Sequence, residues 1–229
     1  MIPILILNRD RLTCTKALCK KLVELGYGEG IHIIDLGSTY PPLLEWYREN
    51  EKMVHYFNNI GHKGIWENSF IKNFSSPWVV VTDSDIALDP DTPAGFIKEM
   101  IELGKYTREN KVGLAIRFSN ITNPILKPII EPIERKYWLT KIPHPRHNIF
   151  SAPVDTTFCI VKPELPFQYN AIRLADYPIT HLDWYSDWTN LTEEEKYYFD
   201  HADPKIATTK QHYLNWLSQK HVPTSISSL

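Results

Sequence analysis

An apolar segment followed at once by two acidic residues constrains this chain more than any other feature of its sequence. Residues 78–82 (WVVVT) are β-branched or aromatic, which is the pattern of a buried strand, and Asp83 and Asp85 come directly after them. Ligands of open α/β sheets bind at the carboxyl ends of strands, and divalent cations such as Mg²⁺ prefer oxygen ligands. The segment Asp83-Ser84-Asp85 is therefore a candidate site for a metal ion and a phosphate, although such tripeptides also end strands in simple turns.

The composition of the chain is that of a globular protein. Its 229 residues suffice for one sizeable domain, and 43% of them are hydrophobic while 23% are charged. The formal net charge of −2 argues against the broad basic face that binds nucleic acid, so no nucleic-acid partner is expected. The three cysteines are odd in number and lack zinc-type spacing, which favours a reducing compartment and a cytoplasmic location.

No transmembrane segment is predicted. The apolar residues 1–7 are too few to cross a bilayer, and they lack the basic start of a secretory signal, so they are predicted to form a first strand. At the other end, the polar residues 221–229 predict either a disordered tail or the stub of a longer chain.

Three strand–helix units are predicted ahead of the strand at residues 78–82. Their strands are expected at residues 2–7, 31–35 and 53–57, and their helices at residues 14–25, from Pro41 to about Asn50, and around Trp66, Phe70 and Ile71. Successive units of this kind imply right-handed crossovers. The predicted fold class is therefore α/β, with a Rossmann-like, mostly parallel central sheet flanked by helices.

The regular strand–helix pattern is interrupted in the second half of the chain. A helix at residues 96–105 and strands at 112–118 and 156–162 continue the α/β pattern. Six prolines within residues 120–153 predict an irregular excursion over one edge of the sheet. Further on, Thr192 and Glu195 form a capping box, which predicts the start of a helix.

A single domain is predicted over residues 1–229. Its nucleotide-binding half is expected at residues 1–118, and an irregular, acceptor-side lobe with C-terminal helices at residues 119–229. This division rests on the change from regular strand–helix units to proline-rich and aromatic segments.

Polar residues follow each of the first four predicted strands, at the edge where ligands of such sheets bind. The candidate nucleotide-binding residues are Asn8, Arg9, Arg11, Asp35, Ser38, His62, Lys63, Asp83 and Ser84. The cations among them can hold diphosphate oxygens, and Asp35 can accept a hydrogen bond from a nucleobase, although Arg9 and Arg11 can also be solvated loop charges. The loops lack the glycine-rich motifs of P-loop NTPases and of dinucleotide-dependent dehydrogenases, which disfavours both classes.

Taken in order, these segments resemble the glycosyltransferases of the GT-A fold. The resemblance is carried by ILILNRDRL at residues 4–12, IIDLGST at 33–39, NIGHK at 59–63, VVTDSD at 80–85 and APVDTTF at 152–158. These motifs span most of the first 160 residues in the family's order. The chain looks most similar to small single-domain bacterial enzymes and to the related domain of large, multi-domain chlorovirus glycosyltransferases.

The resemblance implies transfer of a sugar from a nucleotide-diphosphate donor, expected to be a UDP-sugar, to a glycan or another hydroxyl acceptor. It implies Mn²⁺ or Mg²⁺ at Asp83 and Asp85, with Asp85 as the firmer ligand. Because some members of the family supply a late histidine, His181 is a candidate third ligand. The sequence lacks the Glu-Asp pair and the Gln-x-x-Arg-Trp motif of processive relatives, so a processive synthase is not expected.

A transfer that inverts configuration needs a carboxylate to accept the proton of the acceptor hydroxyl. Asp155 is the first candidate for this base, Asp183 the second and Asp176 the third. The alternative for Asp155 is a strand cap that bonds local backbone. Likewise the aromatic rings of Trp184, Tyr185 and Trp188 are expected either to stack on a sugar or to pack in the core.

Two other functions remain open at this point. A nucleotidyltransferase that makes sugar nucleotides shares the general fold, but a glycine-rich N-terminal loop would be expected in it, and residues 7–11 (LNRDR) contain no glycine. A non-catalytic carbohydrate-binding or scaffolding module would use the acids for a structural metal ion. Such a module has no need of cationic loops beside those acids.

Overall fold

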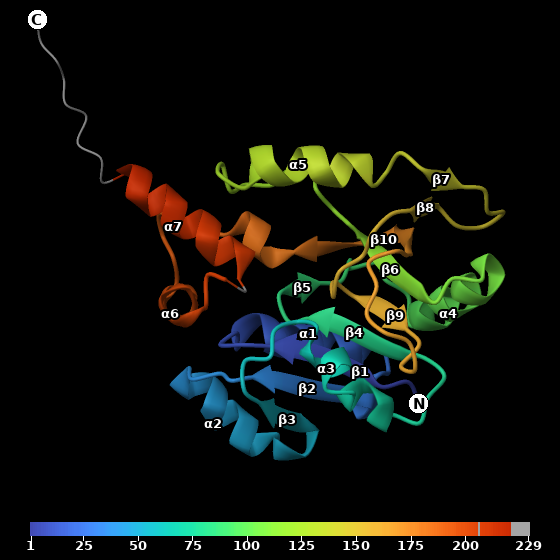
Figure 1. Cartoon of the computed structure of the whole chain (residues 1–229), viewed down its shortest axis with the longest axis horizontal. Coiled ribbons are helices and arrows are strands. Elements are labelled where there is room, and N and C mark those ends of the chain that lie inside the picture. The colour runs from blue at the N-terminus through green and yellow to red at the C-terminus, as the bar shows by residue number, and fades with distance from the viewer. Residues whose placement is uncertain (206, 221–229) are drawn as a thin grey trace, which may run out of the picture.

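The computed structural model describes residues 1–205 and 207–220, and Figure 1 shows how their helices and strands are arranged. The polar segment predicted at residues 221–229 lies outside the described residues. No helix among the described residues is long and apolar enough to span a bilayer.

Four parallel strands form the N-terminal part of the sheet, in the order β3-β2-β1-β4. They are β1 (Ile4–Asn8), β2 (Ile31–Leu36), β3 (Val54–Phe57) and β4 (Val79–Asp83). All five residues of β1 are buried, because helices cover both faces of the sheet at this point. The predicted strands are confirmed, each within two residues of its expected ends.

Short helices link these strands, and the sequence explains where α2 begins and where one predicted helix divides. They are α1 (Thr13–Glu24), η1 (Gly28–Gly30), α2 (Pro41–Glu49), η2 (Glu51–Met53), α3 (Gly64–Glu67) and η3 (Phe70–Asn73). Pro41 and Pro42 occupy the first turn of α2, where no backbone donor is needed. The single helix expected around Trp66 is wrong, because Ser69 adopts a left-handed conformation (φ 62°) and divides it into α3 and η3.

The remaining elements extend the same sheet. They are β5 (Ile86–Ala87), α4 (Phe96–Thr107), β6 (Lys111–Ile116), α5 (Lys127–Lys136), β7 (Lys141–Ile142), β8 (Ile149–Ser151), β9 (Cys159–Val161), β10 (Ile172–His181), η4 (Leu182–Tyr185), α6 (Glu193–His201) and α7 (Thr208–Lys220). Strand β9 lies antiparallel between β4 and β6, so β6 and its parallel partner β10 point the same way as β1. The expected α/β class with a largely parallel sheet is confirmed, and the architecture is consistent with a Rossmann-like GT-A fold.

Two features of the second half differ from the sequence prediction. The proline-rich excursion is not wholly irregular, since it contains α5, with Pro132 inside the helix, and the antiparallel pair β7–β8. The strand expected at residues 156–162 is shorter and covers only β9. The helix predicted from the capping box is confirmed, because Thr192 Oγ1 accepts from the Glu195 amide while the Glu195 carboxylate accepts from the Thr192 amide.

The core has one layer on each face of the sheet. Alternate residues of β1 divide between the layers, so that Ile4 and Ile6 pack with α1 while Leu5 and Leu7 pack with α3. Trp184 and Trp188 belong to the layer of Ile4 and are 8% and 6% exposed. Both indoles are therefore mainly part of the core.

Candidate active site

A cavity of about 280 Å³ lies where β1, β2 and β4 end, and residues at the end of α6 and at the start of α7 also line it. Figure 1 shows α6 and α7 at the same end of the molecule. Of the residues predicted from sequence, those that line it are Asn8, Arg9, Arg11, His62, Asp83, Ser84, Asp85, Asp155, His181 and Asp183. The fold thus gathers side chains that lie up to 175 residues apart in the chain. The lining of this cavity does not include Asp35, Ser38, Lys63 or Asp176.

Asp83 and Asp85 form the acidic centre of the cavity. Burial, and then the neighbouring charge of Asp85, raise the pKa of Asp83 to about 7, although Thr156 Oγ1 donates a hydrogen bond of 2.8 Å to Asp83 Oδ1. His181 Nδ1 lies 3.5 Å from Asp85 Oδ2, and the His181 ring stacks on Trp184 at 4.9 Å between ring centres. The fold therefore holds two carboxylates and an imidazole close together in a poorly solvated place.

This donor set fits a divalent cation bound together with a phosphate. No group of three or more ligating side chains is arranged as a ready-made metal cage among the residues that the structure covers. Mg²⁺ and similar ions, however, are commonly held by one or two carboxylates and complete their shell with substrate phosphates and water. Burial, and then the neighbouring charge of Asp85, disfavour the charged form of Asp83, and a bound cation would favour that charged form. Asp83 and Asp85 are thus suited to such an ion.

Asp155 presents its carboxylate to the cavity from the segment that leads into β9. Its side chain is 48% exposed, whereas Val154 and Thr156 on either side of it are buried. His62 Nε2 lies 3.5 Å from Asp155 Oδ1. Asp155 is thus an accessible carboxylate beside the acidic centre, as a proton acceptor needs to be.

Arg11 and Asp183 form a buried ion pair in the cavity wall. Arg11 Nη2 lies 2.7 Å from both carboxylate oxygens of Asp183, and the guanidinium lies 3.7 Å from the centre of the Tyr198 ring. Burial raises the pKa of Asp183, and the charge of Arg11 opposes that rise. In this geometry Asp183 serves as the counter-ion of Arg11, which leaves Asp155 as the more accessible of the two candidate bases.

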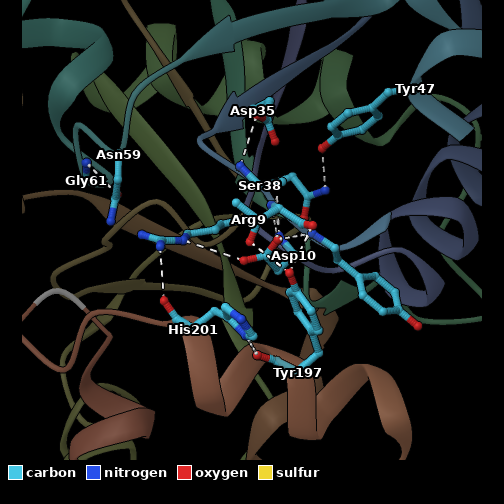
Figure 2. A network of polar contacts seen from close by, with 12 residues as sticks. Arg9, Asp10, Asp35, Ser38, Tyr47, Asn59, Gly61, Tyr197 and His201 are labelled. Carbon is cyan, nitrogen blue, oxygen red and sulfur yellow. Dashed lines mark hydrogen bonds and ion pairs between the residues drawn. The ribbon is translucent and has the colours of Figure 1, made fainter. Parts of the chain in front are cut away.

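A polar network joins the loops that follow β1 and β2 (Figure 2). Asp10 Oδ1 accepts hydrogen bonds from the amides of Thr39 (2.6 Å) and Tyr40 (2.9 Å), and Ser38 Oγ accepts one from the Asp10 amide (2.9 Å). Asp10 is fully buried and has a positive φ of 53°, a conformation that Asp tolerates better than most residues. This residue fixes the two loops relative to each other, and its role was not predicted from sequence.

Asp35 and Ser38 belong to this network and do not line the cavity. The Ser38 amide donates to Asp35 Oδ2 at 3.1 Å, and burial raises the pKa of Asp35. Asn8 Nδ2 donates to the Tyr47 hydroxyl at 2.7 Å. Within the described part of the chain, Asn8 Oδ1 and Asp35 Oδ1 have no hydrogen-bond partner. The structure therefore leaves two buried acceptor atoms on this side of the site.

Of the cations predicted to bind phosphate, some line the cavity, whereas Lys63 lies outside it. Arg9 lines the cavity, and its Nη2 donates to the His201 carbonyl oxygen at 3.1 Å, so the arginine also ties the loop after β1 to the end of α6 (Figure 2). Lys63 instead lies over the rings of Phe167 and Tyr169, with its Nζ about 5 Å from each ring centre. Arg9 and His62 are therefore the better placed of these residues for a phosphate in the cavity.

Two further predicted residues lie away from the cavity. The Asp176 carboxylate is engaged by His147 Nδ1 (2.7 Å) and by the Asn148 amide (3.0 Å) on the β8 side of the sheet. Tyr185 lines a second cavity of about 650 Å³, which adjoins the first and shares Arg11, Asp85 and Asp183 with it. Asp176 is thus poorly placed as a base for chemistry at Asp85.

Helix α6 is a part of the site that sequence reasoning missed. Its residue Tyr198 lines the cavity, and the segment after it contributes Ala202, Asp203, Ala207, Thr208 and Thr209. The helix is held by Glu194, whose carboxylate accepts from the Thr13 amide and hydroxyl, and by Tyr197, whose hydroxyl donates to the Thr39 carbonyl oxygen. The capping box located this helix, but no local pattern indicated its docking partner.

No protein-family model and no curated protein matches the chain. Among solved structures, this chain is similar to glucosyl-3-phosphoglycerate synthase from Mycobacterium tuberculosis in complex with Mn²⁺ and UDP-glucose, at 14% identity and a TM-score of 0.40. That match covers 72% of this chain but only 56% of the synthase, so this chain spans little more than half of its length.

Other similar structures include HddC from Yersinia pseudotuberculosis complexed with GMP-PN, at 15% identity and a TM-score of 0.37, covering 82% of this chain and 80% of HddC. Another is apo UDP-glucose pyrophosphorylase, at 10% identity and a TM-score of 0.39, covering 96% of this chain and 100% of that one. Because these TM-scores lie below 0.5, the assignment of the site rests on the geometry of this chain.

Proposed function

We propose that this protein is a metal-dependent glycosyltransferase that moves a sugar from a nucleotide-diphosphate donor, a UDP-sugar, to a hydroxyl group of a glycan or another acceptor. The observation that carries the proposal is the placement of Asp83 and Asp85 at the end of β4, in one cavity with Arg9, His62 and Asp155. Carboxylates for a cation, basic side chains for a diphosphate and an accessible carboxylate for a proton are the groups that such a transfer needs.

In the proposed reaction, the acceptor oxygen bonds to the anomeric carbon while the bond from that carbon to the diphosphate breaks. The proton of the acceptor hydroxyl passes to the Asp155 carboxylate, and configuration inverts. Arg9 and His62 stabilise the negative charge that develops on the departing diphosphate. A Mn²⁺ or Mg²⁺ ion held by Asp83 and Asp85 supplies further neutralisation of that charge when it is bound.

The first experiment is a calorimetric titration of UDP, GDP, CDP and ADP, with and without Mn²⁺. We expect one nucleotide, UDP, to bind in a Mn²⁺-dependent manner, and the binding to be lost in Asp85→Ala. The control is Asp91→Ala, which removes an exposed acid from the same segment and should leave binding intact. If the folded wild-type protein binds none of the four nucleotides, the donor site is wrong and a carbohydrate-binding module becomes the better explanation.

The role of Asp155 is tested by turnover. In Asp155→Asn, we expect UDP affinity to persist while UDP release from UDP-glucose slows by about 10²–10⁴-fold, the usual contribution of a general base. The same substitution at Asp176, which lies outside the cavity, should leave the rate close to that of the wild type. A normal rate in Asp155→Asn would transfer the role of base to another residue.

A further inference from the structure

Lys111, the first residue of β6, is a buried lysine without an acidic partner. It is 1% exposed, and none of the described carboxylates lies within ion-pair distance of it. Its Nζ instead donates to the carbonyl oxygens of Val154 (2.7 Å) and Gln168 (2.8 Å), and it lies 4.6 Å from the centre of the Phe167 ring. All three partners belong to the segment that precedes or follows β9, so the ammonium group ties the two ends of this segment together.

A second buried cation holds the preceding carbonyl group of the same segment. Arg173 on β10 is 4% exposed, and its Nε and Nη2 both donate to the Pro153 carbonyl oxygen, at 2.9 and 2.7 Å. Its Nη1 donates to Glu134 Oε2 at 2.6 Å, which fixes the guanidinium to α5. Consecutive carbonyl groups are therefore bound by cations from two neighbouring strands, β6 and β10.

The backbone on both sides of these carbonyl groups is also held. The Val154 amide donates to the Tyr169 carbonyl oxygen at 2.8 Å, and Thr156 Oγ1 donates to Asp83 at 2.8 Å. The Val154 side chain packs so closely on Gly113 that a Cβ at that glycine would stand 2.7 Å from the valine methyl carbons. The segment thus has no room to shift toward β6.

Asp155 is the exposed residue between these anchored neighbours. Val154 and Thr156 are 1% and 2% exposed, so the chain directs alternate side chains inward and leaves Asp155 directed at the cavity. Among the described residues, its carboxylate forms one ion pair, with His62 at 3.5 Å, and both of these side chains are more than a third exposed. The direction of the carboxylate therefore depends on the backbone that Lys111 and Arg173 hold.

Burying two cations costs desolvation free energy, and well-packed apolar residues can often replace such groups without loss of stability. The observed contacts give these cations a different use. We propose that Lys111 and Arg173 are positioning residues, which hold the Pro153 and Val154 carbonyl groups so that the Asp155 carboxylate faces the acidic centre. The catalytic consequence rests on the proposed function, whereas the mechanical one does not.

The test uses Lys111→Met, which keeps the length of the side chain and removes its donor, and Lys105→Met on the exposed face of α4 as the matched control. Hydrogen exchange of the Val154 amide reports how firmly the segment is held, because this amide exchanges when its bond to the Tyr169 carbonyl oxygen opens. We expect this amide to exchange faster in Lys111→Met, with β1 unchanged and Lys105→Met like the wild type. Unchanged exchange at Val154, or the same acceleration throughout the sheet, would overturn the proposal.

Turnover of UDP-glucose supplies the catalytic readout. A displacement of about 1 Å at a reacting group can cost roughly 10²-fold in rate. We therefore expect kcat to fall by about that factor in Lys111→Met, while KM and the Mn²⁺-dependent affinity for UDP stay close to the wild-type values. Equal losses in kcat and in UDP affinity would indicate a general structural defect and contradict a positioning role.

The two readouts separate this proposal from the proposed function. If the wild-type protein neither binds UDP nor turns over UDP-glucose, the glycosyltransferase assignment fails, and exchange at Val154 still decides whether Lys111 fixes the segment. If binding and turnover are normal in Lys111→Met, the positioning role fails while the assignment stands.

Discussion

The buried pair of Glu134 and Arg173 allows a quantitative test of how this part of the fold is held. The substitution Arg173→Met removes the cation and leaves Glu134, whose side chain is 7% exposed, without its partner. Burial already raises the pKa of Glu134, and the charge of Arg173 opposes that rise. Without Arg173 the carboxylate has to take up a proton or remain charged in a poorly solvated place.

The free energy that Glu134 costs the folded Arg173→Met variant has an upper bound, which is the cost of protonating its carboxylate. Protonation of a carboxyl group with an ordinary pKa of 4.5 costs about 3.4 kcal/mol at pH 7, because each pH unit contributes about 1.36 kcal/mol. The Pro153 carbonyl oxygen also loses its donors, which costs roughly 1–3 kcal/mol. The single variant should therefore be less stable than the wild type by up to roughly 4–6 kcal/mol at pH 7.

The double variant Arg173→Met, Glu134→Met removes the uncompensated carboxylate and leaves only the unpaired Pro153 carbonyl. We expect it to recover up to about 3.4 kcal/mol relative to the single variant at pH 7. At pH 5 the recovery should shrink to about 0.7 kcal/mol. The sign follows because a raised carboxyl pKa lowers stability above pH 4.5 and has no effect well below it.

The measurement is urea-induced unfolding followed by circular dichroism at pH 7 and pH 5, with linear extrapolation to water. Parallel curves for the three proteins would validate the comparison, since a changed slope indicates a changed denatured state. If the double variant is no more stable than the single variant at pH 7, or if the gap between them does not narrow at pH 5, then Glu134 is not held as a buried counter-ion.

Three further predictions concern stability. His32 Nδ1 and His55 Nε2 lie 3.1 Å apart, and burial lowers the pKa of both rings. The contribution of this pair to stability should therefore be complete above pH 6.5 and decrease on acidification. The variant His55→Phe should weaken this pH dependence, measured as Tm against pH. Gly113→Ala should lower stability by roughly 1–3 kcal/mol in urea unfolding, because its methyl group meets Val154. Thr192→Ala should cost about 1 kcal/mol by the same assay, through loss of the α6 cap.

The parallel half of the fold was predictable because its signals are local. A continuous apolar run such as residues 2–7 indicates a strand buried on both faces, and Pro41 marks the first turn of a helix without reference to the rest of the chain. The acids after β4 follow the same logic, since their position at a strand end already implies a shared edge with other loops.

Elements that depend on distant contacts were not predictable in this way. Strand β10 is interrupted by Pro178 and has a register shift where it pairs with β6, so its sequence lacks a clean alternation. Helix α5 contains Pro132, which removes a backbone donor, and the helix is fixed by the buried bond between Glu134 and Arg173. In both cases tertiary contacts override a local pattern that argues against the element.

The same distinction separates the site residues that were found from those that were missed. Asp83 and Asp85 are marked by the strand before them, whereas Tyr198 enters the cavity only because α6 packs on loops more than 150 residues earlier in the chain. In the sequence, Lys111 looks like an ordinary charged residue at the start of a strand. In the structure it is buried, and its ammonium group donates to the carbonyl oxygens of Val154 and Gln168. Local patterns therefore identify groups at strand ends but not the residues that hold them.

These contacts also bear on the expected division at residue 118. Strand β9 comes from the second half of the chain and lies between β4 and β6, which both come from the first half. A fragment that ends at residue 118 would leave the facing edges of β4 and β6 unpaired, and exposed edges of apolar strands favour aggregation. It would also lack Asp155, His181 and the α6 wall of the cavity. The sheet and the cavity therefore each draw on both sides of the expected division.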